Sequence, residues 1–376
     1  MTIDTEKVAA ECVKAINDKI KNLKHLNIIV VGKTGVGKST LINSVFREKL
    51  AETGMGKPVT THMRKITKKN YPLAIYDTRG FELGKNAQDE VKKEVVDVIR
   101  KGIAENDVNK AIHCIWYCIN TMSNRVEPEE LKWIREFSKE NQITQVPVFV
   151  ILTQSLSKKK ANEMRNIILN ENLDVKQVIP VLAEKYELDD RPIQPYGLDR
   201  LIQAMSEALP DSLQDTLQNV QIASLDEKKR RANSAIAAAV TLAVGVSSTP
   251  IPLTDCAMLI PIEITMISSI TAIFGLEVSK SVIMGFLSST IGASGATVLG
   301  KTIVANLMKL IPGGGTIGGI AISTATAGVI TAALGETYLM IMIAVYKGEM
   351  NMKDLESKEG KAKIRGIFNK QLRVLR

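Results

Sequence analysis

The sequence predicts an α/β domain with a mostly parallel sheet and helices on both faces, followed by an all-α hydrophobic helical domain. Strand-like runs alternate with helical patterns from residue 27 to about residue 210, which is typical of a sheet covered by its crossover helices. From residue 232 to residue 346 only seven residues are charged, and small and β-branched residues prevail. A glycine-rich turn joins the first strand-like run to the helical pattern that follows it.

Composition narrows the class of protein further. The chain has 376 residues, which suits about two or three domains, and its formal net charge is +9. That excess favours an acidic partner such as nucleic acid, nucleotide phosphates or an anionic membrane face. The four cysteines lack the spacing of a zinc site, so we expect buried thiols in a reducing compartment. The first residues lack the apolar run of a signal peptide, so we expect a cytoplasmic protein.

The elements of the α/β region follow in order after an amphipathic helix over residues 1–25. Its strand-like runs are NIIVV, LAIYD, IHCIWYCI, VPVFVILT and VIPVL. Its helical patterns cover residues 86–104, 128–140, 157–170 and 197–209. The segment RKITKKN, directly before LAIYD, is a candidate antiparallel edge strand. We expect about four helices between residues 232 and 346, and then an amphipathic tail.

The glycine-rich turn reads GKTGVGKS and fits the pattern G-x-x-x-x-G-K-[ST] in full, with a strand before it and a helix start after it. Glycines let the backbone N–H groups turn inward around phosphate oxygens, and the helix N-terminus adds its dipole. Lys38 can neutralise the β- and γ-phosphates, and Ser39 can coordinate Mg²⁺. The other expected nucleotide-binding residues of the loop are Lys33, Thr34, Gly35, Val36, Gly37 and Thr40.

A second motif that can contact the phosphates follows the glycine-rich turn further along the chain. LAIYDTRGFE places Asp77 and Gly80 as D-x-x-G at the end of a strand. Asp77 can hold Mg²⁺ directly or through water, and the Gly80 N–H can sense a γ-phosphate. Between the two motifs, KPVTTH supplies Thr60 and Thr61, either of which can close over Mg²⁺ and the γ-phosphate as a first switch.

GKTGVGKST, PVTTH and DTRGFE together resemble the Era-like and septin-like class of GTPases over residues 27–210, and the loop is also similar to that of immunity-related GTPases. The order of domains resembles bacterial GTPases with a C-terminal hydrophobic helical domain of uncharacterised function. In those proteins a PIP-x-x-D segment and an IPG-rich turn recur, and here they read PIPLTD and IPGGG. The resemblance implies GTP as substrate, Mg²⁺ as cofactor, in-line phosphoryl transfer to water, and Thr60 as the switch threonine.

The guanine-reading motif departs from this family. Where [NT]-K-x-D is expected after VPVFVILT, the chain has Thr-Gln-Ser-Leu at residues 153–156. Thr153 and the stem of Gln154 can still pack on the base, and Ala183 lies where such folds direct a backbone N–H to the base oxygen. Without an Asp in the motif, we expect weaker discrimination of GTP from ATP, unless Asp174 or Glu184 replaces the carboxylate.

The residues expected at the hydrolytic site also differ from the family pattern, because Phe81 occupies the position where many GTPases have a glutamine that orients water. We therefore expect slow intrinsic turnover unless Arg79, Arg125 or a residue donated across a homodimer supplies order. The expected catalytic residues are Lys38, Thr60 and Arg79, and the expected metal ligands are Ser39, Thr60 and Asp77.

The apolar third of the chain has two interpretations. Uncharged stretches at about 232–254, 281–300 and 310–335 each reach the roughly 20 residues that cross a bilayer. The segment DEKKRR before the first stretch fits the positive-inside rule and anionic lipid. Against a membrane, Asp255, Glu263 and Glu336 interrupt the apolar helices. A soluble helical bundle, buried against the GTPase domain or a second copy, has the same composition.

These observations predict a cytoplasmic, membrane-associated GTP-binding protein that hydrolyses GTP. Nucleotide state, read at residues 53–64 and 78–88, controls dimerisation or the engagement of lipid or a partner through residues 232–346. The rivals are a non-enzymatic nucleotide-gated scaffold and a ribosome or RNA assembly GTPase, although no module for a specific nucleic acid is visible. The predicted domains are an N-terminal helix (1–25), a GTPase domain (26–212), a helical domain (213–350) and a basic tail (351–376).

Overall fold

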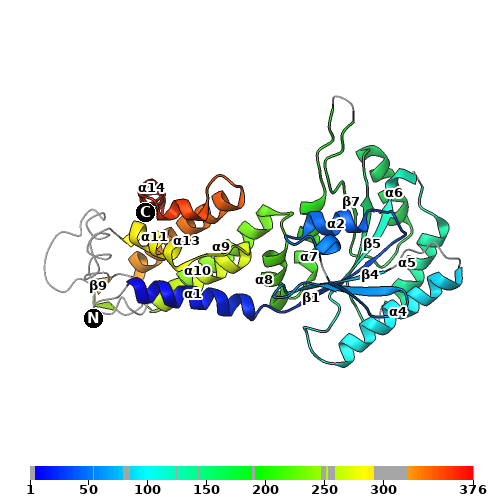
Figure 1. Ribbon diagram of the computed structural model, residues 1–376, viewed down its shortest axis with the longest axis horizontal. Coiled ribbons are helices and arrows are strands. Elements are labelled where there is room, and N and C mark those ends of the chain that lie inside the picture. The colour runs from blue at the N-terminus through cyan, green and yellow to red at the C-terminus, as the bar shows by residue number, and fades with distance from the viewer. Residues whose placement is uncertain are drawn as a thin grey trace. The chain divides into compact units, whose positions relative to one another are not determined.

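The computed structural model describes residues 5–53, 55–78, 85–123, 125–141, 144–188, 191–246, 251–252, 259–291, 321–322 and 324–375. Contacts divide the chain into two units. A sheet unit comprises residues 23–227, and a helical unit comprises residues 1–22 with 228–376. Figure 1 shows the sheet with its helices in the first unit and a group of helices in the second. The predicted fold class, α/β followed by an all-α region, is confirmed.

The sheet of the first unit has seven strands in the order β2-β3-β4-β1-β5-β6-β7. Their bounds are β1 Leu26–Val31, β2 Met55–Pro58, β3 Met63–Thr67, β4 Leu73–Thr78, β5 Cys114–Asn120, β6 Val148–Thr153 and β7 Gln177–Pro180. Strands β4, β1, β5, β6 and β7 are parallel, and β2 and β3 pair antiparallel at one side. Each of the five parallel strands overlaps one of the five predicted runs, because strands covered on both faces read as continuous apolar segments.

The antiparallel addition differs in one respect from the prediction. Strand β3 lies within RKITKKN and its preceding methionine and pairs antiparallel with β4, as predicted. It is not the edge, however, because β2 pairs with its other side. The sequence Met-Gly-Lys-Pro of β2 contains neither alternation of apolar residues nor β-branched residues, so no pattern marks it as a strand.

Helices cover both faces of this sheet (Figure 1). On one face α4 (Lys85–Ala104), α5 (Pro128–Asn141) and α6 (Lys158–Asn170) share an apolar cluster with the strands. On the other face α2 (Lys38–Val45), α7 (Leu198–Ala208) and α8 (Asp211–Val220) share a second cluster. A short helix, α3 (Leu50–Thr53), follows α2.

Helix α8 is not among the helices predicted from the sequence, and the expected domain boundary after residue 212 would cut it. Leu213, Leu217 and Val220 of this helix are fully buried in the cluster of the sheet unit. Thr216 also donates from its hydroxyl to the carbonyl oxygen of Lys24, at 2.7 Å. Contacts therefore place the change of unit after residue 227, fifteen residues later than the predicted boundary (227 minus 212).

The helical unit contains α1 (Thr5–Lys21), α9 (Leu225–Val246, which begins three residues before the unit), α10 (Ile260–Phe274), α11 (Lys280–Ile291), α13 (Thr324–Tyr346) and α14 (Lys358–Val374). Helix α1 packs on α10 and α11, and its buried face includes Cys12 and Ile16. Tyr338 of α13 is buried at a 2.8 Å hydrogen bond to Thr271 of α10. The tail helix α14 buries Ile364, Phe368 and Leu372.

Four helices thus occupy the described part of residues 232–346, in agreement with the prediction. A short antiparallel pair, β8 (Ile251–Pro252) and β9 (Ala321–Ile322), was not predicted. Of PIPLTD only Ile251 and Pro252 are described, and IPGGG lies outside the described residues. Among the described helices, one segment, Ala327–Tyr346, is long and apolar enough to cross a membrane, and 61% of an 18-residue stretch within it is buried in the protein. That burial equally fits the core helix of a soluble bundle.

The position of Lys228 rules it out as part of the basic flank that was expected to meet lipid. In the sequence, Lys228 belongs to DEKKRR, directly before the first apolar stretch. Its side chain is fully buried, and its ammonium donates to the carbonyl oxygen of Ile273 at 2.8 Å. The same ammonium lies 5.8 Å from the ring centre of Phe274 and 5.7 Å from that of Tyr346. An ammonium held inside the helical unit cannot contact lipid headgroups, so residues 229–231 remain as the basic flank.

The cysteines agree with the prediction where they are described. Cys12, Cys114 and Cys118 are free and buried. Burial raises the pKa of the Cys12 and Cys118 thiols to about 12 and raises that of Cys114 as well. These thiols therefore stay protonated and act as small apolar side chains. Cys256 lies outside the described residues.

Candidate functional site

The phosphate loop, residues 32–37, connects β1 to the first turn of α2. Gly32, Gly35 and Gly37 have φ angles of 150°, 76° and 92°, which L side chains rarely adopt. A Cβ atom on Gly32 would also lie 2.6 Å from the carbonyl oxygen of Cys118 on β5. The glycines of the motif are thus required by the backbone path, and the path ends at the N-terminus of α2.

Lys38 lies over this loop. Its ammonium donates to the carbonyl oxygens of Gly32 and Lys33, at 2.8 and 2.9 Å. Thr34, Gly35 and Ser39 are exposed, so the outer surface of the loop is open to a ligand.

Lys33, predicted to bind nucleotide, has its side chain engaged elsewhere. Its ammonium lies 2.5 Å from a carboxylate oxygen of Glu127 and 3.7 Å from one of Glu130, the latter on α5. Burial lowers the pKa of Lys33, but the Glu127 hydrogen bond and the two carboxylates outweigh burial and raise it. The hydrogen bond from Lys33 lowers the pKa of Glu127, whereas burial raises that of Glu130. The side chain of Lys33 is therefore held by these two carboxylates.

Asp77 lies at the carboxyl end of β4, next to β1 in the sheet. One carboxylate oxygen accepts hydrogen bonds from Arg64 Nε and Nη2, at 3.1 and 2.9 Å. The other, Oδ1, is buried without a hydrogen-bond partner. Arg64 is directly opposite Asp77 in the β3–β4 register, and the sequence analysis missed this pair.

The orphaned Asp77 oxygen is an observation on which the fit of Mg²⁺ can be tested. A buried carboxylate oxygen without a partner suits a hydrated cation, and Mg²⁺ prefers carboxylate and hydroxyl oxygens. Ser39, on the helix that follows β1, supplies a hydroxyl at the same end of the neighbouring strand. Both residues therefore fit the group. No set of three or more His, Cys, Asp or Glu side chains among the described residues forms a separate metal site.

Thr60 is held by α4. Its hydroxyl donates a short hydrogen bond to Glu94 Oε2, and the backbone N–H of His62 donates to the same oxygen at 3.2 Å. The His62 ring nitrogen Nδ1 lies 3.1 Å from the other oxygen of Glu94. We call Thr60, His62 and Glu94 the switch cluster. In it, the predicted switch threonine uses its hydroxyl on Glu94, and Thr61 is exposed.

Several predicted residues are placed differently or not described. Arg79, Gly80 and Phe81 lie outside the described residues. Arg125 is exposed in the turn before α5, where its carbonyl oxygen accepts a hydrogen bond from Ser123.

A pocket of about 160 Å³ lies beside the phosphate loop. The residues that line it are Gly37, Thr40, Thr153, Gln154, Val181, Leu182, Ala183, Glu184, Lys185 and Tyr186. They come from the loop, the end of β6 and the segment after β7, so three predicted base-binding residues, Thr153, Gln154 and Ala183, are brought together here.

Thr153 and Gln154 tie this pocket to the phosphate loop. The Thr153 hydroxyl lies 2.5 Å from the carbonyl oxygen of Val36, and Gln154 Nε2 donates to that of Gly35 at 3.1 Å. Gln154 itself has a φ angle of 53°. Asp174, one candidate for the missing carboxylate, precedes β7 and so lies at the amino end of a strand whose other end faces the pocket. Position therefore leaves Glu184, which lines the pocket.

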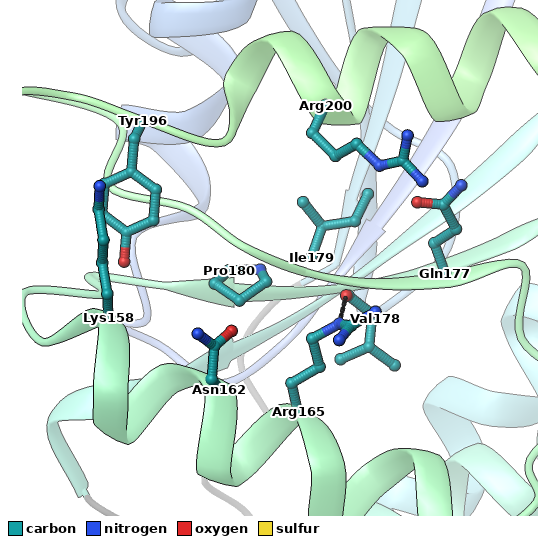
Figure 2. Close-up of a pocket in the computed structure, with 9 residues that line it drawn as sticks. All are labelled: Lys158, Asn162, Arg165, Gln177, Val178, Ile179, Pro180, Tyr196 and Arg200. Atoms are coloured by element: carbon teal, nitrogen blue, oxygen red, sulfur yellow. Dashed lines mark hydrogen bonds between the residues drawn. The ribbon is translucent and has the colours of Figure 1, made fainter.

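A second pocket, of about 350 Å³, lies along β7 between α6 and α7 (Figure 2). Lys158, Arg165 and Arg200 line it, together with uncharged residues. Arg165 Nε donates to the carbonyl oxygen of Val178 at 3.0 Å, and the Lys158 ammonium lies 4.9 Å from the Tyr196 ring centre. No residue of the phosphate loop lines this pocket, so it is not the nucleotide site. Its cations protect β7, an edge strand, from pairing with other chains.

Two family models match the chain. Residues 27–179 match the family described as 50S ribosome-binding GTPase, and residues 211–370 match a domain of unknown function, DUF697. The second match begins at α8, close to the predicted boundary and earlier than the change of unit seen in contacts.

Curated relatives match part of the chain. Septin-9 of Rattus norvegicus is 27% identical over 136 residues, covering 30% of this chain and 24% of the septin. GTPase Era of Clostridium botulinum is 28% identical over 169 residues, covering 42% and 50%. Magnetosome membrane protein 22 of Magnetospirillum gryphiswaldense is 32% identical over 100 residues, covering 27% and 51%. The chain thus spans about a quarter of the septin and about half of the other two relatives.

Solved structures give weaker likenesses. A probable GTP-binding protein engB has 21% identity and a TM-score of 0.31, covering 48% of this chain and 97% of that one. Toc33 from Arabidopsis thaliana, solved in complex with Mg²⁺ and GMPPNP, has 19% identity and a TM-score of 0.31, covering 54% and 91%.

Proposed function

From the premise that the chain carries a P-loop GTPase domain of the Era-like and septin-like kind ahead of a DUF697 domain, we propose that it binds GTP and hydrolyses it to GDP and phosphate. The observation that carries this proposal is the continuity between the phosphate loop and the pocket beside it. Gly37 belongs to the loop and lines the pocket, and Thr153 and Gln154 bond the loop from the other side. Phosphates and a base can therefore be held by one connected structure.

The geometry of the described residues supports the following roles in this proposal. The N–H groups of residues 33–40 surround the phosphates, and Lys38 moves from the loop carbonyls to the β- and γ-phosphate oxygens. Ser39 and Asp77 would hold Mg²⁺, which neutralises charge on those phosphates when it is bound. Arg64 would orient the Asp77 carboxylate by bonding Oδ2, which leaves Oδ1 free to hold Mg²⁺. Gly80 and Arg79 keep their proposed roles at the γ-phosphate.

The switch cluster gives the nucleotide cycle a structural basis. A threonine whose hydroxyl closes over a γ-phosphate must leave Glu94, the carboxylate that also accepts from the N–H of His62. GDP lacks the γ-phosphate and so does not compete with Glu94 for Thr60. The described arrangement is thus the one that we assign to the GDP-bound or free protein.

Turnover is expected to depend on protein concentration. Phe81 cannot orient water, so a homodimer that donates a group across the GTPase domains would raise activity per chain. Phosphate release measured over about a hundredfold range of protein tests this, because a dimer with a micromolar Kd, about 8 kcal/mol of binding free energy, forms within that range. Specific activity that is fast and constant across the range would contradict the dimer and favour a catalyst within the chain. GTP binding without any phosphate release would instead favour a nucleotide-gated scaffold.

We further propose that the helical unit engages lipid, supported by the apolar segment Ala327–Tyr346 and by the name of the magnetosome membrane relative. Replacing Lys229, Arg230 and Arg231 by Gln should weaken flotation with anionic vesicles more than with neutral ones, by about 1 kcal/mol per residue that contacts headgroups. Lys228→Gln is not part of this set, because Lys228 is buried.

A full-length chain that stays unbound with every lipid mixture and nucleotide would contradict the proposal. Sedimentation with ribosomes would then favour the ribosome-assembly alternative, in line with the description of the matching family.

A further inference from the structure

We propose that Glu184 is the residue that selects guanine, in place of the Asp that the Thr-Gln-Ser-Leu segment lacks. The inference rests on the proposed function and names the specificity determinant of that site. It moves base reading from the segment after β6 to the segment after β7. The contacts of both segments support this transfer.

The segment after β6 is occupied in holding the protein together. Thr153 and Gln154 bond the carbonyl oxygens of Val36 and Gly35 in the phosphate loop. The Ser155 hydroxyl donates to the carbonyl oxygen of Leu152 at 2.8 Å, and Ser155 is fully buried. Leu156 has no polar side-chain atom and does not line the pocket. None of the four side chains therefore presents a carboxylate to a base.

The segment after β7 has a defined position and an available carboxylate. Leu182 and Tyr196 exchange two backbone hydrogen bonds, at 3.1 and 3.0 Å, and these fix the start of the segment. Ala183 and Glu184 follow directly and both line the pocket. Glu184 is exposed, is the one carboxylate among the residues that line this pocket, and has no hydrogen-bond or ion-pair partner among the described residues.

The neighbouring lysine does not neutralise Glu184. The Lys185 ammonium lies 2.6 Å from a carboxylate oxygen of Glu187, which does not line the pocket. The Glu184 carboxylate therefore remains able to accept hydrogen bonds from a ligand. Since the same short segment carries Ala183, it can offer an N–H donor and a carboxylate acceptor side by side.

That combination matches guanine and not adenine. The Watson–Crick edge of guanine has an acceptor, O6, beside two donors, N1–H and the 2-amino group, which suit an N–H and a carboxylate respectively. Adenine has a donor at position 6 and an acceptor at N1, so both contacts become unfavourable. A site built around such hydrogen bonds rejects a base that cannot make them. Xanthine has an oxygen in place of the 2-amino group, so it would repel a carboxylate but accept from an amide N–H₂.

The test is Glu184→Gln in the full-length chain, with Glu187→Gln as the matched control on the same segment. GTP, ATP and xanthosine triphosphate compete with a fluorescent GTP analogue in the presence of Mg²⁺. The wild-type chain should prefer GTP over ATP by about a hundredfold or more. Glu184→Gln should weaken GTP binding by about tenfold or more and strengthen xanthosine triphosphate binding by about tenfold, with ATP binding unchanged.

Each outcome separates this inference from the proposed function. The gain of xanthosine triphosphate binding cannot arise from a misfolded protein, and Glu187→Gln should behave as wild type. If Glu184→Gln keeps the wild-type preference for GTP and gains no affinity for xanthosine triphosphate, Glu184 does not read the base. If the wild type binds GTP and ATP equally, the inference fails while nucleotide binding stands. If the wild type binds none of the three, the proposed function fails.

Discussion

Replacing Lys38 by Ala is expected to weaken GTP binding by at least about tenfold, or about 1.4 kcal/mol. The Lys38 ammonium lies on the loop carbonyls of Gly32 and Lys33, within reach of the position that the loop provides for phosphates. The substitution removes the cation that balances the β- and γ-phosphates but leaves the glycine backbone intact. Titration with a fluorescent GTP analogue measures the loss.

The control for this experiment is Lys159→Ala, which removes an exposed lysine from α6 in the same unit. It changes the net charge equally, and Lys159 is not among the residues that line the pocket. Equal affinities for the wild type and Lys38→Ala would show that the loop does not hold phosphates. Equal losses for both lysine variants would show an effect of overall charge alone.

Removing the carboxylate of Glu94 is expected to raise the affinity for a non-hydrolysable GTP analogue by about tenfold while leaving that for GDP unchanged. Glu94 accepts hydrogen bonds from the Thr60 hydroxyl and from the His62 N–H. Hydrogen bonds to charged groups contribute about 1.5–3 kcal/mol, and the triphosphate-bound state must break the one to Thr60. Without Glu94 that cost disappears, so Glu94→Ala shifts the balance toward the triphosphate state.

Glu90→Ala is the matched control on the same helix. The Glu90 carboxylate lies 4.0 Å from His62 Nε2 and is more exposed than that of Glu94. Competition binding with GDP and the GTP analogue should therefore give a changed ratio of affinities for Glu94→Ala and a wild-type ratio for Glu90→Ala. An unchanged ratio in both variants would mean that the switch cluster does not resist the triphosphate state.

The sequence was sufficient for the parts of the fold that have a strong periodic pattern. The parallel strands are buried on both faces and therefore read as apolar runs, and their crossover helices have long amphipathic patterns. Strand β2 and helix α8 were missed for different reasons. Strand β2 has four residues including a glycine and a proline, whereas α8 follows α7 after a two-residue break and contains the predicted domain boundary.

In the candidate site, too, features with a local sequence pattern can be predicted and features without one cannot. The phosphate loop and D-x-x-G are contiguous motifs, so residue types and spacing alone predict them; the structure describes the loop glycines and Asp77, whereas Gly80 lies outside the described residues. The partners of the motif residues are distant in sequence: Arg64 for Asp77, Glu94 for Thr60 and Glu127 for Lys33. Strand register and helix packing bring these pairs together, and no local pattern encodes such contacts. Lys228 illustrates the same limit, because three basic residues follow it in sequence whereas its ammonium contacts two aromatic rings and the carbonyl oxygen of Ile273.

The central claim, that this chain hydrolyses GTP at the phosphate loop, is tested most directly by a single-turnover assay. The purified full-length chain, in excess over γ-labelled GTP and with Mg²⁺ present, is followed for release of labelled phosphate, with Lys38→Ala and ATP in parallel reactions. The account predicts slow release from GTP by the wild type, less release from ATP, and little from either nucleotide with Lys38→Ala. Release of phosphate at the same rate by the wild type and Lys38→Ala, or no binding of GTP by the wild type, would contradict it.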